Sequence, residues 1–292
     1  MTVPTTSLTA EFFPSRTARA VQHLRHLRWA KVVPLLVLAL VALTSPILLR
    51  FDPEVVVGPS SQAPDGTYWF GTDSSGLDIF SRTLAATRLN LMIALVVTVA
   101  ATTIGCIVGL VIGMNESRRG PVGWVSRGVA RLVDLIEAIP AVLTGLVIIA
   151  FFGVSTGTLM IALSVVLAPV QIRLVRTEVL RVRSEVYLDA ARSGGQSELG
   201  LTLRHVLPNS ISSAVENCSV IFAVAIIVTA ALGFVGAGVA PPTPEWGAML
   251  TRGASDATVG RWWPAAFPAL ALGLTIAAVS VGFNELLRRR RA

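Results

Sequence analysis

Six long apolar runs alternate with polar stretches along the chain. A helix needs about 20 apolar residues to cross the hydrocarbon core of a bilayer, and the runs lie near that length. They cover residues 32–49, 89–113, 132–152, 158–172, 211–239 and 265–287, and Pro140 lies inside the third run. The pattern predicts an all-α membrane protein with six transmembrane helices.

The polar stretches divide the chain into four parts. Residues 1–31 precede the first run, and residues 32–88 hold the first helix and a loop rich in Pro, Gly, Ser and Asp. Residues 89–287 hold the other five helices, with a polar interruption at residues 173–209. Residues 288–292 end the chain with a basic tail.

Composition and charge agree with a membrane protein and indicate its orientation. The chain is 53% hydrophobic and 14% charged, with a mean hydropathy of +0.70, whereas soluble domains carry about 25% charged residues. With six helices assigned, 19 of the 24 Lys and Arg residues lie on the side that holds both termini and residues 173–209. The positive-inside rule therefore predicts that both termini are cytosolic. Because the arginines flank apolar runs, we expect the bilayer and not nucleic acid to be the partner of this basic chain.

The sequence shows no catalytic cluster. It lacks the phosphate-binding loop pattern Gly-x-x-x-x-Gly-Lys-Ser/Thr, so we expect no nucleotide to bind through such a loop. Its three histidines are scattered, and Cys106 and Cys218 both fall inside apolar runs. This spacing predicts neither a metal site nor a disulfide framework. We expect a non-catalytic chain without a cofactor or metal of its own.

Three acidic residues lie close to predicted span ends. Asp134 and Glu137 share one helical face at the start of the third run, and Glu216 follows the start of the fifth, next to Asn217. Charges at membrane depth are costly and tend to serve function, which makes these four residues candidates for lining a translocation pathway. The alternative is structural, because acids near a helix start are favoured by its dipole and reach water.

Small residues recur at four-residue intervals on two predicted helices. One face holds Gly105, Gly109 and Gly113, and another holds Ala269, Gly273 and Ala277. Close helix contact in lipid depends on such faces. They indicate either packing within one bundle or contact with another subunit.

The polar interruption at residues 173–209 has the pattern of an elbow. Residues 173–191 can form a helix, Ser193-Gly194-Gly195 breaks it, Ser197 can cap a short second helix, and Pro208 ends that helix before the fifth run. A helix-turn-helix that projects into the cytosol suits docking of another protein. A plain cytosolic loop is the alternative.

The elbow resembles the "EAA" signature of ABC importer permeases. That signature is Glu-Ala-Ala, three residues, Gly, nine residues, then Ile-x-Leu-Pro, and every spacing is present here. Asp189 stands in place of Glu, and His205 stands in place of Ile. The resemblance implies that the ATPase-coupling residues are Asp189, Ala190, Ala191, Arg192, Gly195, Leu207 and Pro208.

Two further stretches are similar to the dipeptide, oligopeptide and nickel branch of that family. Residues 69–82 are similar to its Phe-Gly-Thr-Asp-x-x-Gly-Arg-Asp-x-x-Ser-Arg segment, with Leu77 in place of Arg. Residues 234–250 are similar to its Phe-Leu-Gly-Leu-Gly-x-x-Pro-Pro-x-Pro-x-Trp-Gly-x-Met-Leu segment. Thr229, just upstream, stands where the family often has Glu. The three stretches occur in the family's order.

The resemblance implies a type I ABC importer permease fold in the inner membrane of a bacterium. It implies a second homologous permease subunit, two cytosolic ATPase subunits that bind ATP and Mg, and an extracytoplasmic substrate-binding protein. The implied cargo is a dipeptide or short oligopeptide, with nickel or haem as alternatives. The loops at residues 50–88 and 240–263 would either receive the binding protein or pack across the mouth of the bundle. A carrier working alone is the rival hypothesis, but it would place charges at mid-membrane.

Overall fold

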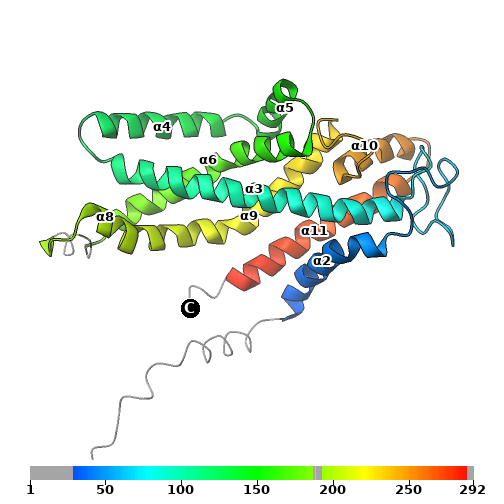
Figure 1. The fold of residues 1–292 in the computed structure, drawn as a ribbon, viewed down its shortest axis with the longest axis horizontal. Helices are drawn as coiled ribbons and strands as arrows, with labels where there is room; N and C mark the ends of the chain where they lie inside the picture. Colours follow the sequence, from blue (N-terminus) through cyan, green and yellow to red (C-terminus); the bar gives the residue numbers. More distant parts are fainter. Residues whose placement is uncertain (1–28, 187, 189–192, 288–292) are drawn as a thin grey trace, which may run out of the picture.

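The structure is a computed structural model that describes residues 29–186, 188 and 193–287. This part of the chain is a helical bundle (Figure 1). Its helices are α2 (Trp29–Leu48), α3 (Ile79–Asn115), α4 (Pro121–Glu137), α5 (Ala141–Phe152), α6 (Thr156–Arg183), α8 (Glu198–Leu201), α9 (Leu207–Phe234), α10 (Trp246–Ala257) and α11 (Trp263–Leu287), with a π-helical turn η1 (Thr202–Val206) before α9. Five of them are long and apolar enough to cross a membrane, and the number rises to six if the bent pair of α4 and α5 is counted as one span.

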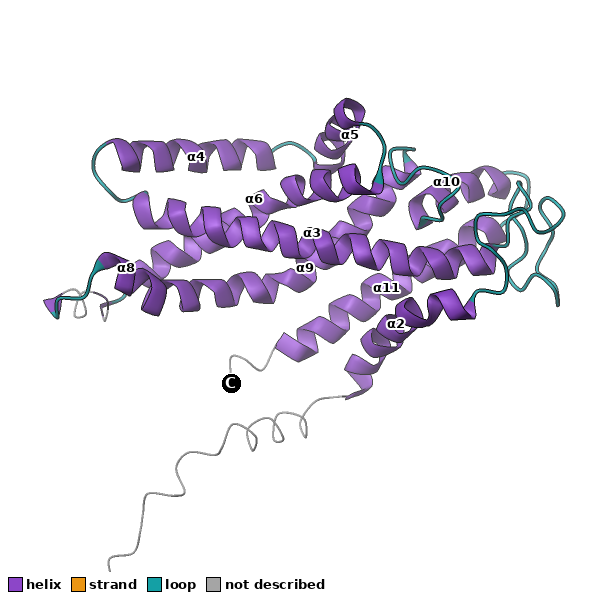
Figure 2. Cartoon of the chain, viewed as in Figure 1, coloured by secondary structure: helices purple, strands orange, loops and turns teal. Residues whose placement is uncertain are grey.

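Three long helices, α3, α6 and α9, lie side by side along the long axis, and α2 and α11 pair beside them (Figure 1). The two longest connections, residues 49–78 and 235–262, lie toward one end of the bundle (Figure 2), and we name them the loop end. The opposite end holds the described residues between α6 and α9, which are 184–186, 188 and 193–206, and we name these residues the elbow. The all-α prediction is confirmed.

The glycine face of α3 is used within the chain. A Cβ on Gly109 would lie 2.7 Å from the carbonyl oxygen of Ile172, and one on Gly113 would lie 2.7 Å from the Cβ of Val179. The absent side chains therefore let α3 and α6 approach closely. The corresponding face of α11 is different, because Ala269, Gly273 and Ala277 are exposed.

Helix α3 begins ten residues before the apolar run that predicts it. Asp78 caps the helix, since its carboxylate accepts a hydrogen bond of 2.8 Å from the backbone N–H of Ser81. The first turns bury the polar residues Ser81, Arg82 and Asn90. The predicted start at residue 89 is wrong because hydropathy excludes Ser81 and Arg82, although the fold buries them.

The third predicted span is broken. Helices α4 and α5 meet at an angle of 96°. Pro140 lies at the junction as the residue before α5, and a proline can neither donate a backbone hydrogen bond nor let the residue before it stay helical easily. Helix α4 also begins at Pro121, in the polar stretch between the second and third apolar runs, where no helix is predicted. Its apolar residues recur at helical spacing between arginines, so no continuous apolar run marks it.

The fourth and fifth predicted spans also change length. Helix α6 continues past the predicted end at residue 172 to Arg183, so its polar last turns belong to the same helix as the span. Helix α9 ends at Phe234 instead of residue 239. Gly236 there has a φ of +89°, and the N–H of Ala237 bonds back to the carbonyl of Leu232 at 2.8 Å, which closes the helix in a Schellman motif.

Candidate functional site

The elbow joins the last turn of α6 to the first turn of α9. Four of its predicted coupling residues, Asp189, Ala190, Ala191 and Arg192, lie outside the described residues. Gly195, Leu207 and Pro208 lie within them. Helix α6 ends at Arg183, and the hydroxyl of its C-cap residue Ser184 donates to the carbonyl of Arg181 at 2.7 Å. The sequence predicts one helix from residue 173 to residue 191, and this break corrects that prediction.

Gly195 forms the exposed tip of the elbow. Its φ of +83° is in the left-handed region, which costs a residue with a Cβ about 1–2 kcal/mol. Within the described part of the chain, no heavy atom lies within 4 Å of the position that a Cβ would occupy. The glycine therefore sets the backbone turn without being packed against the bundle, and the described elbow leaves its surface open.

The second arm of the elbow runs directly into α9. Ser197 caps α8, because its hydroxyl accepts a hydrogen bond of 3.2 Å from the N–H of Gly200, as predicted. Pro208 does not end this arm, which corrects the prediction. It lies in the first turn of α9, where a proline is tolerated. Since Pro208 has no N–H and crowds the preceding turn, the helix widens there, and the N–H of Leu207 bonds to the carbonyl of Thr202.

A separate apolar cluster attaches the elbow to the bundle. Leu188 in the first arm is 1% exposed, as are Leu201 and Val206 in the second arm. They pack with Met114 of α3, and with Val175, Val179 and Val182 of α6 and Ala214 of α9. Because side chains from three long helices hold both arms, a displacement of the elbow will move the ends of those helices with it.

Ion pairs next to the elbow join α4, α6 and the end of α3. Arg176 binds Glu116 through two parallel hydrogen bonds, Nε to Oε2 at 2.7 Å and Nη2 to Oε1 at 2.6 Å. Arg173 binds Glu137 at 2.7 Å, and Asp134 lies 3.8 Å from Arg176. Asp134 and Glu137 therefore lie against arginines of α6. They are in the last turn of α4 and not at a helix start, so the expected stabilisation by the helix dipole is wrong, and the ion pairs offset their charges instead. The sequence analysis missed Glu116, which no motif marks.

A buried amide links three helices farther along the bundle. Gln171 of α6 donates to the hydroxyl of Thr102 in α3 at 2.8 Å and to the carbonyl of Ala214 in α9 at 3.3 Å. Asn217 donates to the Gln171 side-chain oxygen at 3.2 Å. Glu216, the neighbour of Asn217, is partly buried in α9. Gln171 was missed, although a glutamine in an apolar run is a visible signal.

A serine motif between α5 and α6 has a structural role. Residues Gly153 to Gly157 fit the Gly-x-Ser-x-Gly spacing of a hydrolase nucleophile. The hydroxyl of Ser155 accepts a hydrogen bond of 3.0 Å from the N–H of Thr158, which caps the start of α6. The motif therefore marks a helix start.

The loop at residues 49–78 packs against the loop at 235–262, where Arg261 donates to the Ser61 hydroxyl at 2.8 Å, and against the start of α11. Trp263 donates through Nε1 to the carbonyl of Thr72 at 3.2 Å, and the ring of Phe70 stacks on that of Phe267 at 3.9 Å. Trp69 and Trp262 remain exposed. The loops thus form one cap, and its use as a landing surface for a binding protein stays a prediction.

The positions that depart from the family pattern lie in three settings. Leu77 is buried under the cap, with its backbone N–H bound to Asp73 at 3.0 Å, so its apolar side chain fills the cap interior. Thr229 is fully buried in α9, and its hydroxyl has no hydrogen-bond partner among the described residues. His205 lies in η1, and Asp189 lies outside the described residues.

Glu245 holds the cap to α9. It is fully buried, and its carboxylate accepts hydrogen bonds from the N–H groups of Gly247 at 2.7 Å and Ala248 at 2.9 Å, which caps α10. Burial raises the pKa of Glu245 to about 7. Gly233 of α9 leaves the space in which this carboxyl group lies.

Comparison with known proteins identifies the family. Residues 101–292 match the model of the binding-protein-dependent transport system inner membrane component family. The chain belongs to this family. It is a multi-pass inner-membrane permease subunit, which confirms the predicted family and location.

Curated relatives extend the similarity over most of the chain. The glutathione transport system permease protein GsiD of Pectobacterium atrosepticum is 33% identical, covering 88% of this chain and 84% of the relative. The dipeptide transport system permease protein DppC of Alkalihalophilus pseudofirmus is 33% identical, covering 85% of this chain and 78% of the relative.

A solved structure shows the same fold. The permease fold of the MetNI methionine ABC transporter, solved in inward-facing conformations, matches with a TM-score of 0.54 at 18% identity. The match covers 68% of this chain and 93% of that one. The predicted type I importer fold is therefore confirmed.

Proposed function

We propose that this chain is one of two membrane subunits of an ATP-driven importer that carries dipeptides or short oligopeptides into the cytosol. The chain itself is non-catalytic. Two cytosolic ATPase subunits bind ATP and Mg, a second homologous permease completes the pathway, and an extracytoplasmic binding protein delivers the substrate. Membership in the binding-protein-dependent family is the observation that carries this proposal.

The names of the relatives support a peptide cargo. Two relatives that cover more than three quarters of this chain carry names for glutathione and dipeptide transport. Both compounds are short peptides with free carboxylates. The stretches at residues 69–82 and 234–250, which resemble the same branch, contact each other at the loop end, where Arg82 donates to the carbonyl of Pro242 at 3.2 Å.

The elbow supplies the surface for the ATPase subunits. Its tip at Gly195 is exposed, while Leu188 and Leu201 fix its arms to the bundle. A partner that closes on ATP binding and moves this tip would shift the ends of α3, α6 and α9 as a rigid unit. This assignment places the elbow and both termini in the cytosol, in agreement with the arginine count.

Reconstitution of the complex tests the function. The two permeases and two ATPase subunits are placed in liposomes, and uptake of a labelled dipeptide is measured with and without the binding protein and ATP. We expect uptake that requires both. Uptake by this chain alone, without ATP, would establish the rival hypothesis of a stand-alone carrier.

A further inference from the structure

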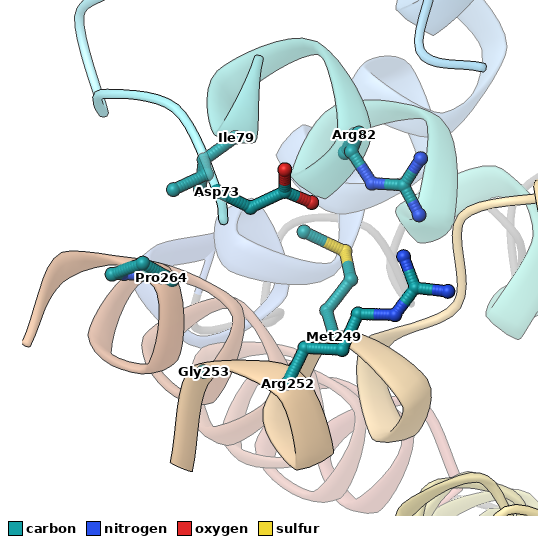
Figure 3. Close-up of a pocket in the computed structure, with 7 residues that line it drawn as sticks. All are labelled: Asp73, Ile79, Arg82, Met249, Arg252, Gly253 and Pro264. Carbon is teal, nitrogen blue, oxygen red and sulfur yellow. The ribbon is translucent and has the colours of Figure 1, made fainter. Parts of the chain in front are cut away.

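An apolar groove runs along the outer face of α3. Residues of α3, α9 and α11 line it, and its volume is about 420 Å³, within the roughly 300–1,000 Å³ of pockets that hold a small molecule. The cavity between Arg82 and Arg252 at the loop end, drawn in Figure 3, has a volume of about 10 Å³, which is room for one water molecule at most. The groove, unlike that cavity, has space for a ligand.

The α3 side of the groove is a ridge that faces away from the described bundle. Its members recur at four-residue intervals and are all exposed: Leu95, Val99, Thr103, Ile107 and Val111. Close helix contact in lipid depends on small residues, and the glycines of α3 are already packed against α6. The ridge carries large branched side chains instead, so it favours contact with lipid over contact with another helix.

The polar groups in the groove are occupied within the chain. The hydroxyls of Thr98 and Thr103 each donate to the backbone carbonyl four residues earlier at 2.7 Å. The hydroxyl of Thr102 accepts a hydrogen bond of 2.8 Å from Gln171 and lies 3.4 Å from the sulfur of Cys218. A peptide would lose hydrogen bonds to water here without replacing them, whereas a hydrocarbon chain has none to lose. The groove therefore suits an acyl chain.

The length of the groove also matches an acyl chain. From Leu95 to Ile107, α3 rises about 18 Å, and one leaflet of the hydrocarbon core is about 15 Å thick. The rings of Phe222 and Phe283, with centroids 6.2 Å apart, line the opposite side. A second hollow of about 200 Å³ between α3 and α4 begins at Ile107 and continues to Val111. The apolar surface thus extends toward the turn between α3 and α4.

Two arginines lie in that turn, at the end of the apolar surface. Arg118 and Arg119 are both exposed. Arg127 fixes the turn, because its Nη1 donates to the carbonyls of Glu116 at 2.8 Å and Arg118 at 3.4 Å. Among the described residues, the guanidinium groups of Arg118 and Arg119 have no acidic partner. Basic sites beside transmembrane helices bind anionic lipid headgroups.

We propose that the groove binds the acyl chain of an anionic phospholipid whose phosphate contacts Arg118 and Arg119. The two uncompensated charges favour a lipid with a net negative charge over phosphatidylcholine, in which the choline cation offsets the phosphate. The arginine count places this end of the bundle at the cytosolic leaflet. The site does not depend on which substrate the permease carries.

Photolabelling of the purified full-length chain tests the site. Nanodiscs of phosphatidylcholine contain a small fraction of a lipid with a diazirine on its acyl chain and either a phosphatidylglycerol or a phosphatidylcholine headgroup. Mass spectrometry locates adducts in the groove, where Cys106 and Cys218 are reactive traps, and on the exposed face of α2 at Leu43 and Ile47. We expect the phosphatidylglycerol analogue to label the groove several-fold more strongly, and both analogues to label α2 equally. Equal labelling of the groove by both would overturn the site.

Two double variants test the arginines. Arg118→Gln with Arg119→Gln removes two charges, and Arg88→Gln with Arg252→Gln is the control of equal net charge, because those residues lie on the loop-end side of the bundle. Unlabelled phosphatidylglycerol competes with the photoreactive analogue. We expect the mole fraction that halves groove labelling to rise about 30-fold in the first variant, as for two arginines near a membrane surface, and to stay unchanged in the control. Equal shifts in the two variants would refute the role of Arg118 and Arg119.

The assembled importer separates the lipid from a protein occupant of the groove. Labelling is repeated after the second permease and the ATPase subunits have been added. We expect the phosphatidylglycerol analogue to label the groove as strongly as in the isolated chain. Loss of labelling on assembly would assign the groove to the subunit interface and overturn the lipid site.

Discussion

Replacing Glu116 with glutamine tests whether the ion pair between Glu116 of the α3 end and Arg176 of α6 stabilises the protein next to the elbow. The change keeps the size of the side chain but removes the charge that accepts two short hydrogen bonds from Arg176. Both side chains are about one-fifth exposed, at 18% for Glu116 and 22% for Arg176, so solvent screens part of the interaction. Charge-assisted hydrogen bonds contribute about 1.5–3 kcal/mol each, and after screening we expect a total loss of about 2 kcal/mol.

Thermal unfolding of the purified protein in nanodiscs measures this loss. A loss of 2 kcal/mol should lower the unfolding temperature by about 4 °C for a protein of this size. Asp134→Asn is the matched control, because Asp134 is 50% exposed and lies 3.8 Å from Arg176. We expect the control to change the unfolding temperature by less than about 1 °C, as for other exposed ion pairs. Equal shifts for the two variants would refute the assignment of stability to the Glu116–Arg176 pair.

Three further predictions follow from other parts of the fold. The pKa of Glu245 is raised from 4.5 to about 7, so the folded protein keeps a proton that the unfolded protein loses. The free energy of unfolding should therefore fall by up to about 3 kcal/mol as pH rises from about 4.5 to 7. Glu245→Gln should make the unfolding temperature less dependent on pH over this range. Gly109→Ala should destabilise the protein by about 1–3 kcal/mol through its clash with α6, whereas Gly273→Ala, with open space around it, should not. Asp189→Lys should reduce co-purification of the ATPase subunits more than it reduces expression of the permease.

The parts of the fold that were predicted correctly depend on local pattern. Apolar runs identify the helices, and the Gly194-Gly195 pair with Ser197 identifies the turn and cap of the elbow. The errors occur where polar residues are buried or where amphipathic helices replace apolar ones. Arg82 is polar but buried in α3, so a hydropathy boundary excludes it.

The contacts that the sequence analysis missed join residues far apart in the chain. Glu116 and Arg176 are 60 positions apart, and Gln171 and Thr102 are 69 apart. Neither pair has a local spacing that marks it, because the contact exists only once α3 and α6 pack together. The bend after Glu137 was visible as Pro140, but the 96° angle depends on how α5 packs against α6 and α9.

Uptake by a variant with a blocked elbow tip tests the central claim most directly. Gly195→Trp places a large side chain at the proposed ATPase contact, and Gly153→Trp is the matched control, because Gly153 has the same φ of +83° and equally open surroundings. Both variants should remain in the membrane at wild-type levels. We predict that ATP-driven dipeptide uptake is lost in Gly195→Trp and retained in Gly153→Trp. Wild-type uptake by the Gly195→Trp complex would contradict the assignment of the elbow as the ATPase docking site.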